Sequence, residues 1–169
     1  AVDGTPTLKK AIQDKFKREN NLEYKINQIT VGTGGKQVLY NAFVATLNKG
    51  DEVIIPAPFW VSYPDMVLLA GGKPKIVKCD EKNSFKLTAK KLKKVITKKT
   101  KWLILNSPSN PTGAGYTRDE IESLAKILIK NKKIQILSDD IYEHIKYDNF
   151  NFFTIAQNSK LKDRTLTMN

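Results

Sequence analysis

Short apolar runs alternate with stretches of helical pattern along most of this chain. The runs have the length of β-strands, and most stretches between them place apolar residues three or four positions apart, as an amphipathic helix does. Consecutive parallel strands need a crossover, which is usually a helix, so the alternation favours a parallel sheet. The sequence therefore predicts an α/β fold with a mostly parallel sheet and helices on both faces, in three α/β/α layers.

The expected elements can be placed along the chain from this pattern. Helices are predicted over residues 7–19, 36–47, 62–70, the lysine-rich stretch 86–101, and 117–130, with a short helical turn at 141–144. Strands are predicted over residues 29–31, 53–55, 74–79, 101–105, 134–137 and 165–168.

The composition is that of one domain without disulfides or membrane spans. At 169 residues and 40% hydrophobic, the chain can bury the core of a single domain. Its longest apolar runs, 66–70 and 102–105, are far shorter than the ~20 residues that cross a bilayer. The single cysteine, Cys79, fits a reducing compartment, where we expect it to be a small buried hydrophobe. Because residues 1–4 also show no signal peptide, we expect a soluble, cytoplasmic protein with no membrane partner.

The net charge of +12 raises the question of nucleic-acid binding. Only three of the basic residues are arginines, and many lysines cluster in residues 86–101 around an apolar stripe, which is typical of a solvated helix surface. Surfaces that read bases or clamp phosphates more often use arginine and interleaved aromatic residues. We therefore expect no specific nucleic-acid partner, although a basic surface can bind polyanions weakly.

Residues able to bind a ligand follow four of the predicted strands. In an open parallel sheet, ligands bind outside the carboxyl ends of the strands, so these residues should gather at one edge. They are the glycine turn with a lysine at 32–37, Trp60 in the segment 56–60, Asn110 in the loop 106–113, and Asp139 with Tyr142 in the segment 138–142.

The loop 106–113 (NSPSNPTG) is the most informative of these segments. Pro108 and Pro111 fix φ and push the residues before them out of the helical region, so the backbone should be rigid and extended. Asn110 is then held still at the end of a strand, which suits a small ligand better than a core.

Each feature also has an ordinary structural interpretation. A glycine-rich turn that enters a helix is often only a turn, and residues 32–37 match neither a Walker loop nor a dinucleotide fingerprint. Trp60 alone is more often a core residue, Asp139 could cap the next turn, and Tyr142 could pack. His144 is interpreted as a surface or turn residue, because no ligand or acid–base partner is spaced to use it.

Together the features describe one ligand, a flat phosphorylated heteroaromatic ring with a basic nitrogen and a phenolic oxygen. Backbone amides at a helix start suit the phosphate. A carboxylate ~3 Å from a pyridinium gains roughly 5 kcal/mol at an effective dielectric near 20, which keeps the nitrogen protonated. A protonated ring stabilises a carbanion, as in the chemistry of pyridoxal phosphate. The residues assigned are Gly34, Gly35 and Lys36 for the phosphate, Trp60 for the ring face, Asn110 and Tyr142 for the phenolic oxygen, and Asp139 for the nitrogen.

Four motifs, VGTGGKQ at 31–37, PFWVSYP at 58–64, PSNPTG at 108–113 and DDIY at 139–142, closely resemble those of class I aminotransferases. These belong to the fold-type I pyridoxal-phosphate enzymes, and the resemblance is strongest to the bacterial aspartate and aspartate/prephenate aminotransferases. It covers essentially the whole chain. It implies pyridoxal 5'-phosphate as cofactor, amino acid and 2-oxo acid substrates, and a homodimer.

The same resemblance implies roles for single residues. Asp139 pairs with the pyridine nitrogen, Tyr142 and Asn110 contact the phenolic oxygen, and Trp60 stacks on the ring. Asn110 and Trp60 would also contact the substrate, and Lys36 would approach the side-chain carboxylate of an acidic one.

The family's Schiff-base lysine follows the strand that matches residues 165–168, and this chain ends at Asn169. We therefore assign no catalytic residue within the chain. Residues 1–169 are expected to be the central part of the cofactor-binding large domain, an incomplete one, without the small domain, the N-terminal arm or the lysine region. Such a fragment should be inactive alone.

The parent protein is expected to transfer an amino group between aspartate, or a similar amino acid, and 2-oxoglutarate. Alternatives within the fold are a C–S lyase, an aromatic or prephenate aminotransferase, and a transcriptional regulator built on the same fold. A non-catalytic basic binding module is a further alternative, and would bind nucleic acid in a salt-dependent way while ignoring the cofactor.

Overall fold

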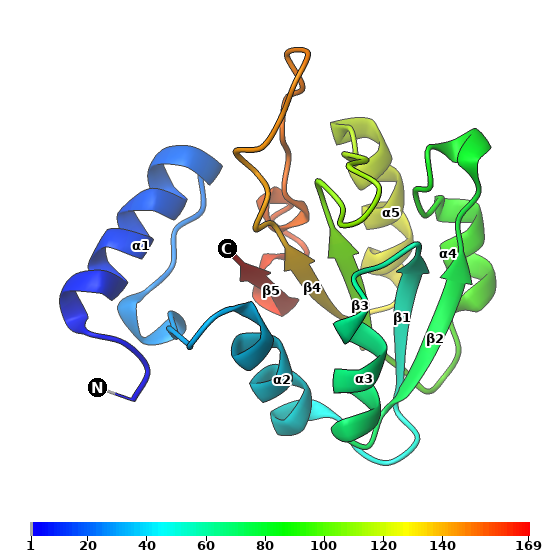
Figure 1. Ribbon diagram of the computed structural model, residues 1–169, viewed down its shortest axis with the longest axis horizontal. Helices are drawn as coiled ribbons and strands as arrows, with labels where there is room; N and C mark the ends of the chain where they lie inside the picture. Colours follow the sequence, from blue (N-terminus) through cyan, green and yellow to red (C-terminus); the bar gives the residue numbers. More distant parts are fainter. Residues whose placement is uncertain (1) are drawn as a thin grey trace.

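A five-stranded parallel sheet forms the middle of three layers in the computed structural model, which describes residues 2–169 (Figure 1). Every pair of neighbouring strands is parallel. The strands are β1 (Glu52–Ala57), β2 (Lys73–Lys78), β3 (Thr100–Asn106), β4 (Gln135–Asp139) and β5 (Thr165–Met168), in the spatial order β2-β1-β3-β4-β5.

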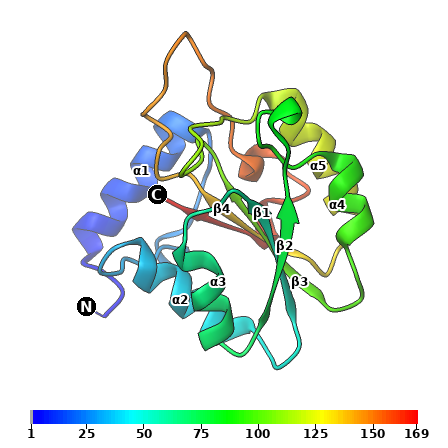
Figure 2. The same cartoon turned by 45° about the vertical axis from the view of Figure 1, so that its right-hand side comes forward.

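Helices cover both faces of this sheet, which confirms the α/β prediction. Helices α2 and α3 lie on one face, and α4 and α5 lie on the other (Figure 2). Helix α1 lies beside the sheet, next to the β5 edge (Figure 1). The α-helices are α1 (Pro6–Asn20), α2 (Gly35–Thr46), α3 (Ser62–Leu69), α4 (Ala89–Val95) and α5 (Arg118–Lys130), and short 3₁₀ turns cover Ile26–Gln28, Glu81–Asn83, Ile155–Gln157 and Lys162–Arg164.

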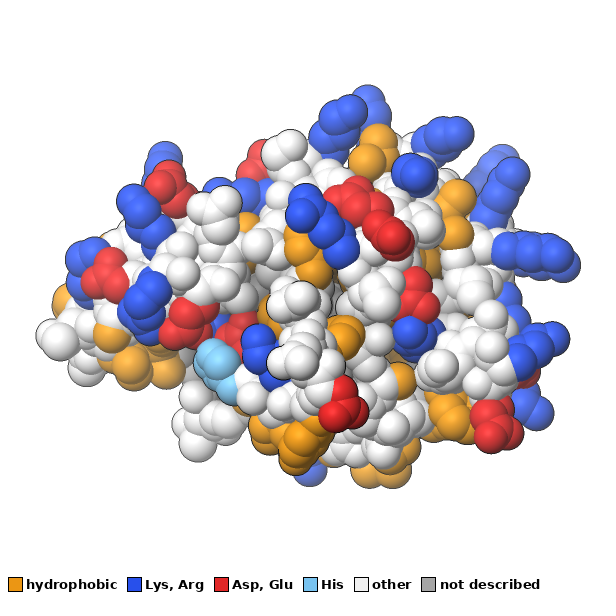
Figure 3. All heavy atoms as spheres, turned by 90° about the horizontal axis from the view of Figure 1, so that it is seen from above, with side chains coloured by type: hydrophobic (Ala, Val, Ile, Leu, Met, Phe, Trp, Pro, Cys, Tyr) orange, Lys and Arg blue, Asp and Glu red, His pale blue; other side chains and the backbone are white. Residues whose placement is uncertain are grey.

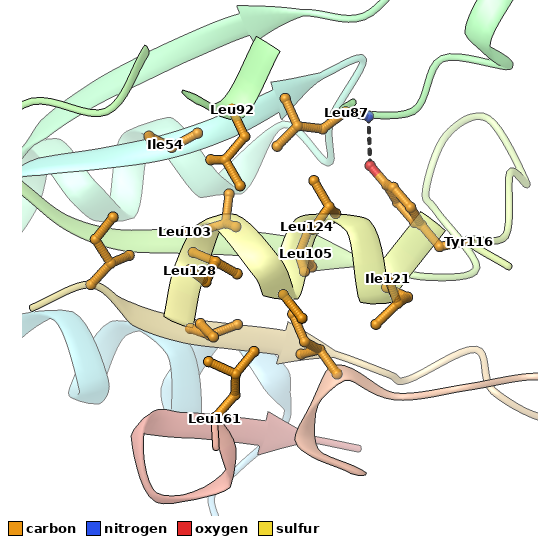
Figure 4. Packing of buried hydrophobic residues seen from close by; sticks show 14 of the residues in the cluster. Ile54, Leu87, Leu92, Leu103, Leu105, Tyr116, Ile121, Leu124, Leu128 and Leu161 are labelled. Atoms are coloured by element: carbon orange, nitrogen blue, oxygen red, sulfur yellow. Dashed lines mark hydrogen bonds between the residues drawn. The ribbon is translucent and has the colours of Figure 1, made fainter. Parts of the chain in front are cut away.

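The hydrophobic core is split by the sheet into two clusters. Successive side chains of a strand point to opposite faces, so Leu103 and Leu105 pack under α4 and α5 (Figure 4), while Ile104 packs under α2 and α3. All three side chains are at most 2% exposed. Strands buried on both faces read as continuous apolar runs, which is why the sequence located them.

Three local predictions need correction. Residues 29–31 form no strand. The Val31 N–H donates to Asp3 O at 2.9 Å, so this segment pairs with the N-terminal segment of the chain and not with an edge of the sheet. The lysine-rich helix is only α4, since Thr88 caps its start and the chain turns at residues 98–99. Residues 141–144 form hydrogen-bonded turns without a regular helix. Cys79 is buried, as expected.

Within the described residues, 2–169, every helix is too short or too polar to cross a bilayer.

The carboxylate of Glu143 ties α1 to the rest of the fold. This side chain is 3% exposed and pairs with the ammonium of Lys15 on α1. Its other contacts are Asn20 Nδ2, 2.6 Å from Oε2, and Asn169 Nδ2, 2.5 Å from Oε1. One buried carboxylate in the turn after β4 thus holds α1 and the end of β5, because each of these two supplies donors that need an acceptor.

We expect Glu143→Gln to lower the free energy of unfolding by about 3 kcal/mol, because it leaves the Lys15 ammonium without its buried partner. Urea denaturation at neutral pH measures the change. Glu19→Gln is the control, since Glu19 lies 3.8 Å from the same ammonium but is 30% exposed, and should cost less than about 1 kcal/mol. Equal losses in the two variants would contradict the role given to Glu143.

Candidate functional site

A cavity of about 350 Å³ opens at the carboxyl ends of β1, β3 and β4, beside the start of α2. From β1 the chain crosses to β2 on one side and then returns to β3 on the other, so the cavity lies where the strand order reverses. Open α/β sheets bind ligands at this point. The cavity is lined by Thr33, Gly34, Gly35, Lys36, Trp60, Tyr63, Asn106, Asn110, Asp139, Ile141, Tyr142 and Met168.

All seven residues that the sequence indicated for ligand binding line this one cavity. They come from four separate segments of the chain, which the parallel sheet brings to one edge. Their gathering is a property of the fold, whereas their individual roles stay predictions. His144 is absent from the lining, and its ring is largely exposed near Glu19.

The start of α2 presents backbone amides to the cavity. Gly34 is the N-cap residue, with φ of +79°, and no side chain caps the helix. A Cβ at Gly34 would meet open space, so glycine is favoured there by backbone conformation. At Gly35 a Cβ would lie 3.4 Å from Met168 Cε. An uncapped helix start of this kind suits an anion such as a phosphate.

Asp139 ends β4 and supplies a buried carboxylate to the cavity, with only 3% of the residue exposed. Its Oδ2 accepts a hydrogen bond from the Tyr63 hydroxyl at 2.5 Å, and its Oδ1 accepts one from Ile141 N–H at 3.4 Å. Burial raises the pKa of Asp139 above its usual value, and both hydrogen bonds act to lower this pKa. A cation bound beside the carboxylate would also lower it.

Trp60 forms an aromatic wall of the cavity. Its half-buried indole meets the Tyr63 ring edge-on, with centroids 5.4 Å apart and planes at 88°. The Lys36 ammonium lies 5.4 Å from the Trp60 ring centroid, within the range of a cation–π contact. This arrangement holds an aromatic surface and a positive charge next to each other.

Asn110 is held in place by Asn106, the last residue of β3, which is itself bound to the last residue of β4. Its N–H donates to Asn106 Oδ1 at 2.7 Å, while Asn106 Nδ2 donates to the Asp139 carbonyl at 2.9 Å. The prediction of an extended loop is wrong, because the chain turns at 110–112 and Gly113 N–H donates back to Ser109 O at 2.8 Å. The hydrogen bond between Gly113 and Ser109 closes the loop, while the prolines restrict its backbone.

Asp140, next to the cavity, is a buried carboxyl with an unsatisfied oxygen. Its Oδ1 accepts a hydrogen bond from Ser138 Oγ at 2.7 Å, whereas Oδ2 has no partner among the described residues. Burial raises the pKa of Asp140 to about 7, and the negative charges of Glu143 and Asp139 add to the rise. A protonated carboxyl avoids burying an uncompensated charge.

A carboxylate group near α1 has the spacing of a metal site but a different occupant. Ligand atoms of Glu19, Glu143 and His144 lie within 4.8 Å of one another. The ammonium of Lys15 contacts both carboxylates, so a cation is already present in the group. The cluster therefore serves as the attachment of α1.

Five lining residues were not assigned from the sequence, and two of them, Tyr63 and Asn106, donate side-chain hydrogen bonds to Asp139. Tyr63 lies at the start of α3, only three positions after the assigned Trp60, and this closeness in sequence was an available signal. Asn106 is a polar residue at the end of a buried strand, which was a second one.

Basic side chains lie mainly away from this cavity. Figure 3 shows lysine and arginine gathered toward the end of the molecule that β2 and α4 form. Lys91 on α4 pairs with Asp80 at 2.6 Å, so part of this charge is balanced locally.

Comparisons with known proteins extend these observations. A family model described as aminotransferase class I and II matches residues 1–169. The aspartate/prephenate aminotransferase of Cereibacter sphaeroides is 61% identical over 170 residues, which cover 100% of this chain and 42% of that protein. The chain thus spans less than half the length of this relative.

Solved structures are similar as well. A crystal structure of the aspartate aminotransferase from Rhizobium meliloti has a TM-score of 0.97 and 53% identity, over 99% of this chain and 42% of that one. The aspartate aminotransferase from Thermus thermophilus with maleate has a TM-score of 0.93 and 40% identity, over 98% of this chain and 42% of that one.

The buried Asp140 makes stability depend on pH. The pKa is 3.8 for an ordinary carboxyl and about 7 in the fold, so the folded state binds the extra proton between these values. Stability due to this group is therefore complete at low pH and falls as the pH rises to about 7, by up to about 4 kcal/mol.

Asp140→Asn removes this titration. Between about pH 4 and about pH 7.5, the unfolding free energy of the wild type should therefore fall relative to that of the variant. Urea denaturation at a series of pH values measures both proteins, and all other groups cancel in the difference. Parallel stability curves would contradict the raised pKa.

Proposed function

Because the chain belongs to the class I and II aminotransferase family, we propose that its cavity binds pyridoxal 5'-phosphate. We further propose that the full-length protein transfers amino groups between aspartate, or a similar amino acid, and 2-oxoglutarate. The observation that carries the proposal is the presence of a buried carboxylate, Asp139, and an uncapped helix start, Gly34 and Gly35, in the lining of one cavity.

The residues present fit this cofactor. Its phosphate carries two negative charges and can accept hydrogen bonds from the N–H groups of Gly35 and Lys36, while Gly34, whose own N–H donates to Gly32 O at 2.9 Å, forms the turn that leads into them. Its ring nitrogen is basic, and Asp139 is the buried anion in the cavity lining. A volume of about 350 Å³ lies within the range of small-ligand pockets, which is roughly 300–1,000 Å³.

Each residue then has a task in the reaction. When bound, the cofactor supplies an electron-withdrawing ring that stabilises negative charge on the substrate Cα. Asp139 keeps a proton on the ring nitrogen, and Trp60 covers one ring face and excludes water from it. Asn110 and Tyr142 donate hydrogen bonds to the phenolic oxygen, and Asn110 also contacts the substrate carboxylate.

Lys36 is the residue that favours an acidic substrate. Its ammonium lies over the Trp60 indole at the cavity, where it can meet a second carboxylate. The Thermus thermophilus structure with the dicarboxylate maleate supports this preference. Prephenate is a second candidate amino acceptor, because the Cereibacter sphaeroides relative carries that name.

The proposed site lies in a larger, dimeric protein. Residues 1–169 belong to the cofactor-binding large domain of a longer, cytoplasmic protein, as the 42% coverage of relatives supports. A homodimer is supported by apolar side chains left exposed on α2 and α3 and just before α3, namely Val44, Val61, Leu68 and Leu69. Light scattering of the full-length protein checks the oligomeric state.

The first test follows pyridoxal phosphate binding by absorbance and amino transfer from aspartate to 2-oxoglutarate by the full-length protein. Asp139→Asn should lower kcat by about a hundredfold or more, because a neutral amide cannot hold the proton on the ring nitrogen. Asp119→Asn is the control, since this exposed carboxylate lies on α5. Equal rates in both variants, or no transfer by the wild type, would refute the proposal.

Lys36→Ala should raise KM for aspartate about fivefold, as expected for an exposed ion pair worth about 1 kcal/mol. KM for alanine, which has no second carboxylate, should stay unchanged. The matched control is Lys90→Ala, which removes an exposed lysine from α4. Steady-state kinetics with both amino acids makes the comparison, and a parallel change for alanine would remove Lys36 from substrate selection.

A further inference from the structure

Tyr63 contacts the two residues that define the cavity's aromatic wall and its buried charge. Its hydroxyl donates to Asp139 Oδ2 at 2.5 Å, and its ring meets Trp60 edge-on. We propose that Tyr63 is a positioning residue, whose hydroxyl fixes Oδ2 and so assigns Oδ1 of Asp139 to the ring nitrogen of the ligand. This inference rests on the proposed binding of pyridoxal phosphate.

The two carboxylate oxygens of Asp139 differ in their free accepting capacity. Oδ2 has a short bond from Tyr63, whereas the contact of Oδ1 is the long 3.4 Å one from Ile141 N–H. An ionised carboxylate offers about four lone-pair sites, and its rotation about the Cβ–Cγ bond would exchange the oxygens. The Tyr63 bond prevents that exchange, so a ligand meets a carboxylate of fixed orientation.

The neutral charge of the donor matters for this task. Tyr63 is 2% exposed, and its pKa is raised by burial and by the charge of Asp139, so it stays protonated. A lysine or arginine at this position would hold the carboxylate but also neutralise it, and would compete with a pyridinium. A phenol orients Asp139 and leaves its charge for the ligand.

The Tyr63 ring and hydroxyl can be tested separately. Tyr63 N–H donates to Trp60 O at 3.1 Å, and the ring packs against the indole, so Tyr63→Phe keeps both contacts and removes only the hydroxyl. Tyr116→Phe is the matched control. Tyr116 is also buried, at 4% exposure, and its hydroxyl accepts a bond from Leu87 N–H at 2.7 Å on the other face of the sheet (Figure 4).

The first experiment measures dissociation constants of the full-length protein for two probes, pyridoxal phosphate and its 1-deaza analogue, which has C–H in place of the ring nitrogen. We expect Tyr63→Phe to weaken binding of pyridoxal phosphate about tenfold and binding of the analogue less than twofold, because the hydroxyl acts only through the nitrogen's partner. Tyr116→Phe should change neither constant. Equal weakening of both probes by Tyr63→Phe would overturn the proposal.

The second experiment needs no bound cofactor. A pH titration of the ¹³C-labelled Asp139 carboxyl by NMR, assigned with Asp139→Asn, should show its pKa about one unit higher in Tyr63→Phe, because a bond to the charged form is lost. Tyr116→Phe should leave it unchanged. An unchanged Asp139 pKa in Tyr63→Phe overturns the positioning role, whereas failure of the wild type to bind pyridoxal phosphate overturns the proposed function instead.

Fluorotyrosine provides a version of this test that keeps the Tyr63 hydroxyl and changes only its strength as a donor. Its hydroxyl is more acidic and hence a stronger donor, so replacing the tyrosines with it should lower the pKa of Asp139. The shift should persist in Tyr116→Phe and vanish in Tyr63→Phe. A shift that survives the loss of Tyr63 would contradict the proposal.

Discussion

The parallel pairing of β3 with β4 is the interaction on which the cavity depends. Their register places Asn106 beside Asp139, the last residues of the two strands. The Asp139 carbonyl accepts hydrogen bonds from Ser107 N–H at 3.3 Å and from Asn106 Nδ2 at 2.9 Å. A one-residue slip would send the Asp139 side chain to the opposite face, so the ladder sets both the position and the direction of the buried carboxylate.

The two-sided core allows this edge of the sheet to carry polar groups. Central strands are buried by α2 and α3 on one face and by α4 and α5 on the other, so the sheet does not rely on its carboxyl edge for stability. Asp139, Asp140 and Glu143 are buried there, and each is compensated differently. Asp139 accepts hydrogen bonds, Glu143 has an ammonium partner, and Asp140 has a raised pKa that favours its neutral form.

Much of the fold and of the candidate site could be predicted, because both depend on local pattern. Continuous apolar runs marked the buried strands, and the topology of parallel crossovers brought the residues after them to one edge. The short run at 29–31 has the composition of a strand, but within residues 2–169 it has no strand beside it to pair with. Composition alone does not show whether a pairing partner lies nearby, so this prediction was wrong. Tyr63 was missed as a partner of Asp139 because the two residues are 76 positions apart, and only the folded sheet brings them together.

The cavity is assembled from segments that span residues 33–168, and it includes Met168 at the end of the last strand. No single helix–strand unit contains it, so it comes into existence only when the sheet is complete from β1 to β5. A molecule that binds there therefore recognises the assembled sheet and binds partly folded chains more weakly. By mass action such a ligand lowers the population of unfolded chains and so protects the protein from degradation. A binding site at the edge of a sheet thus also favours the survival of correctly folded molecules.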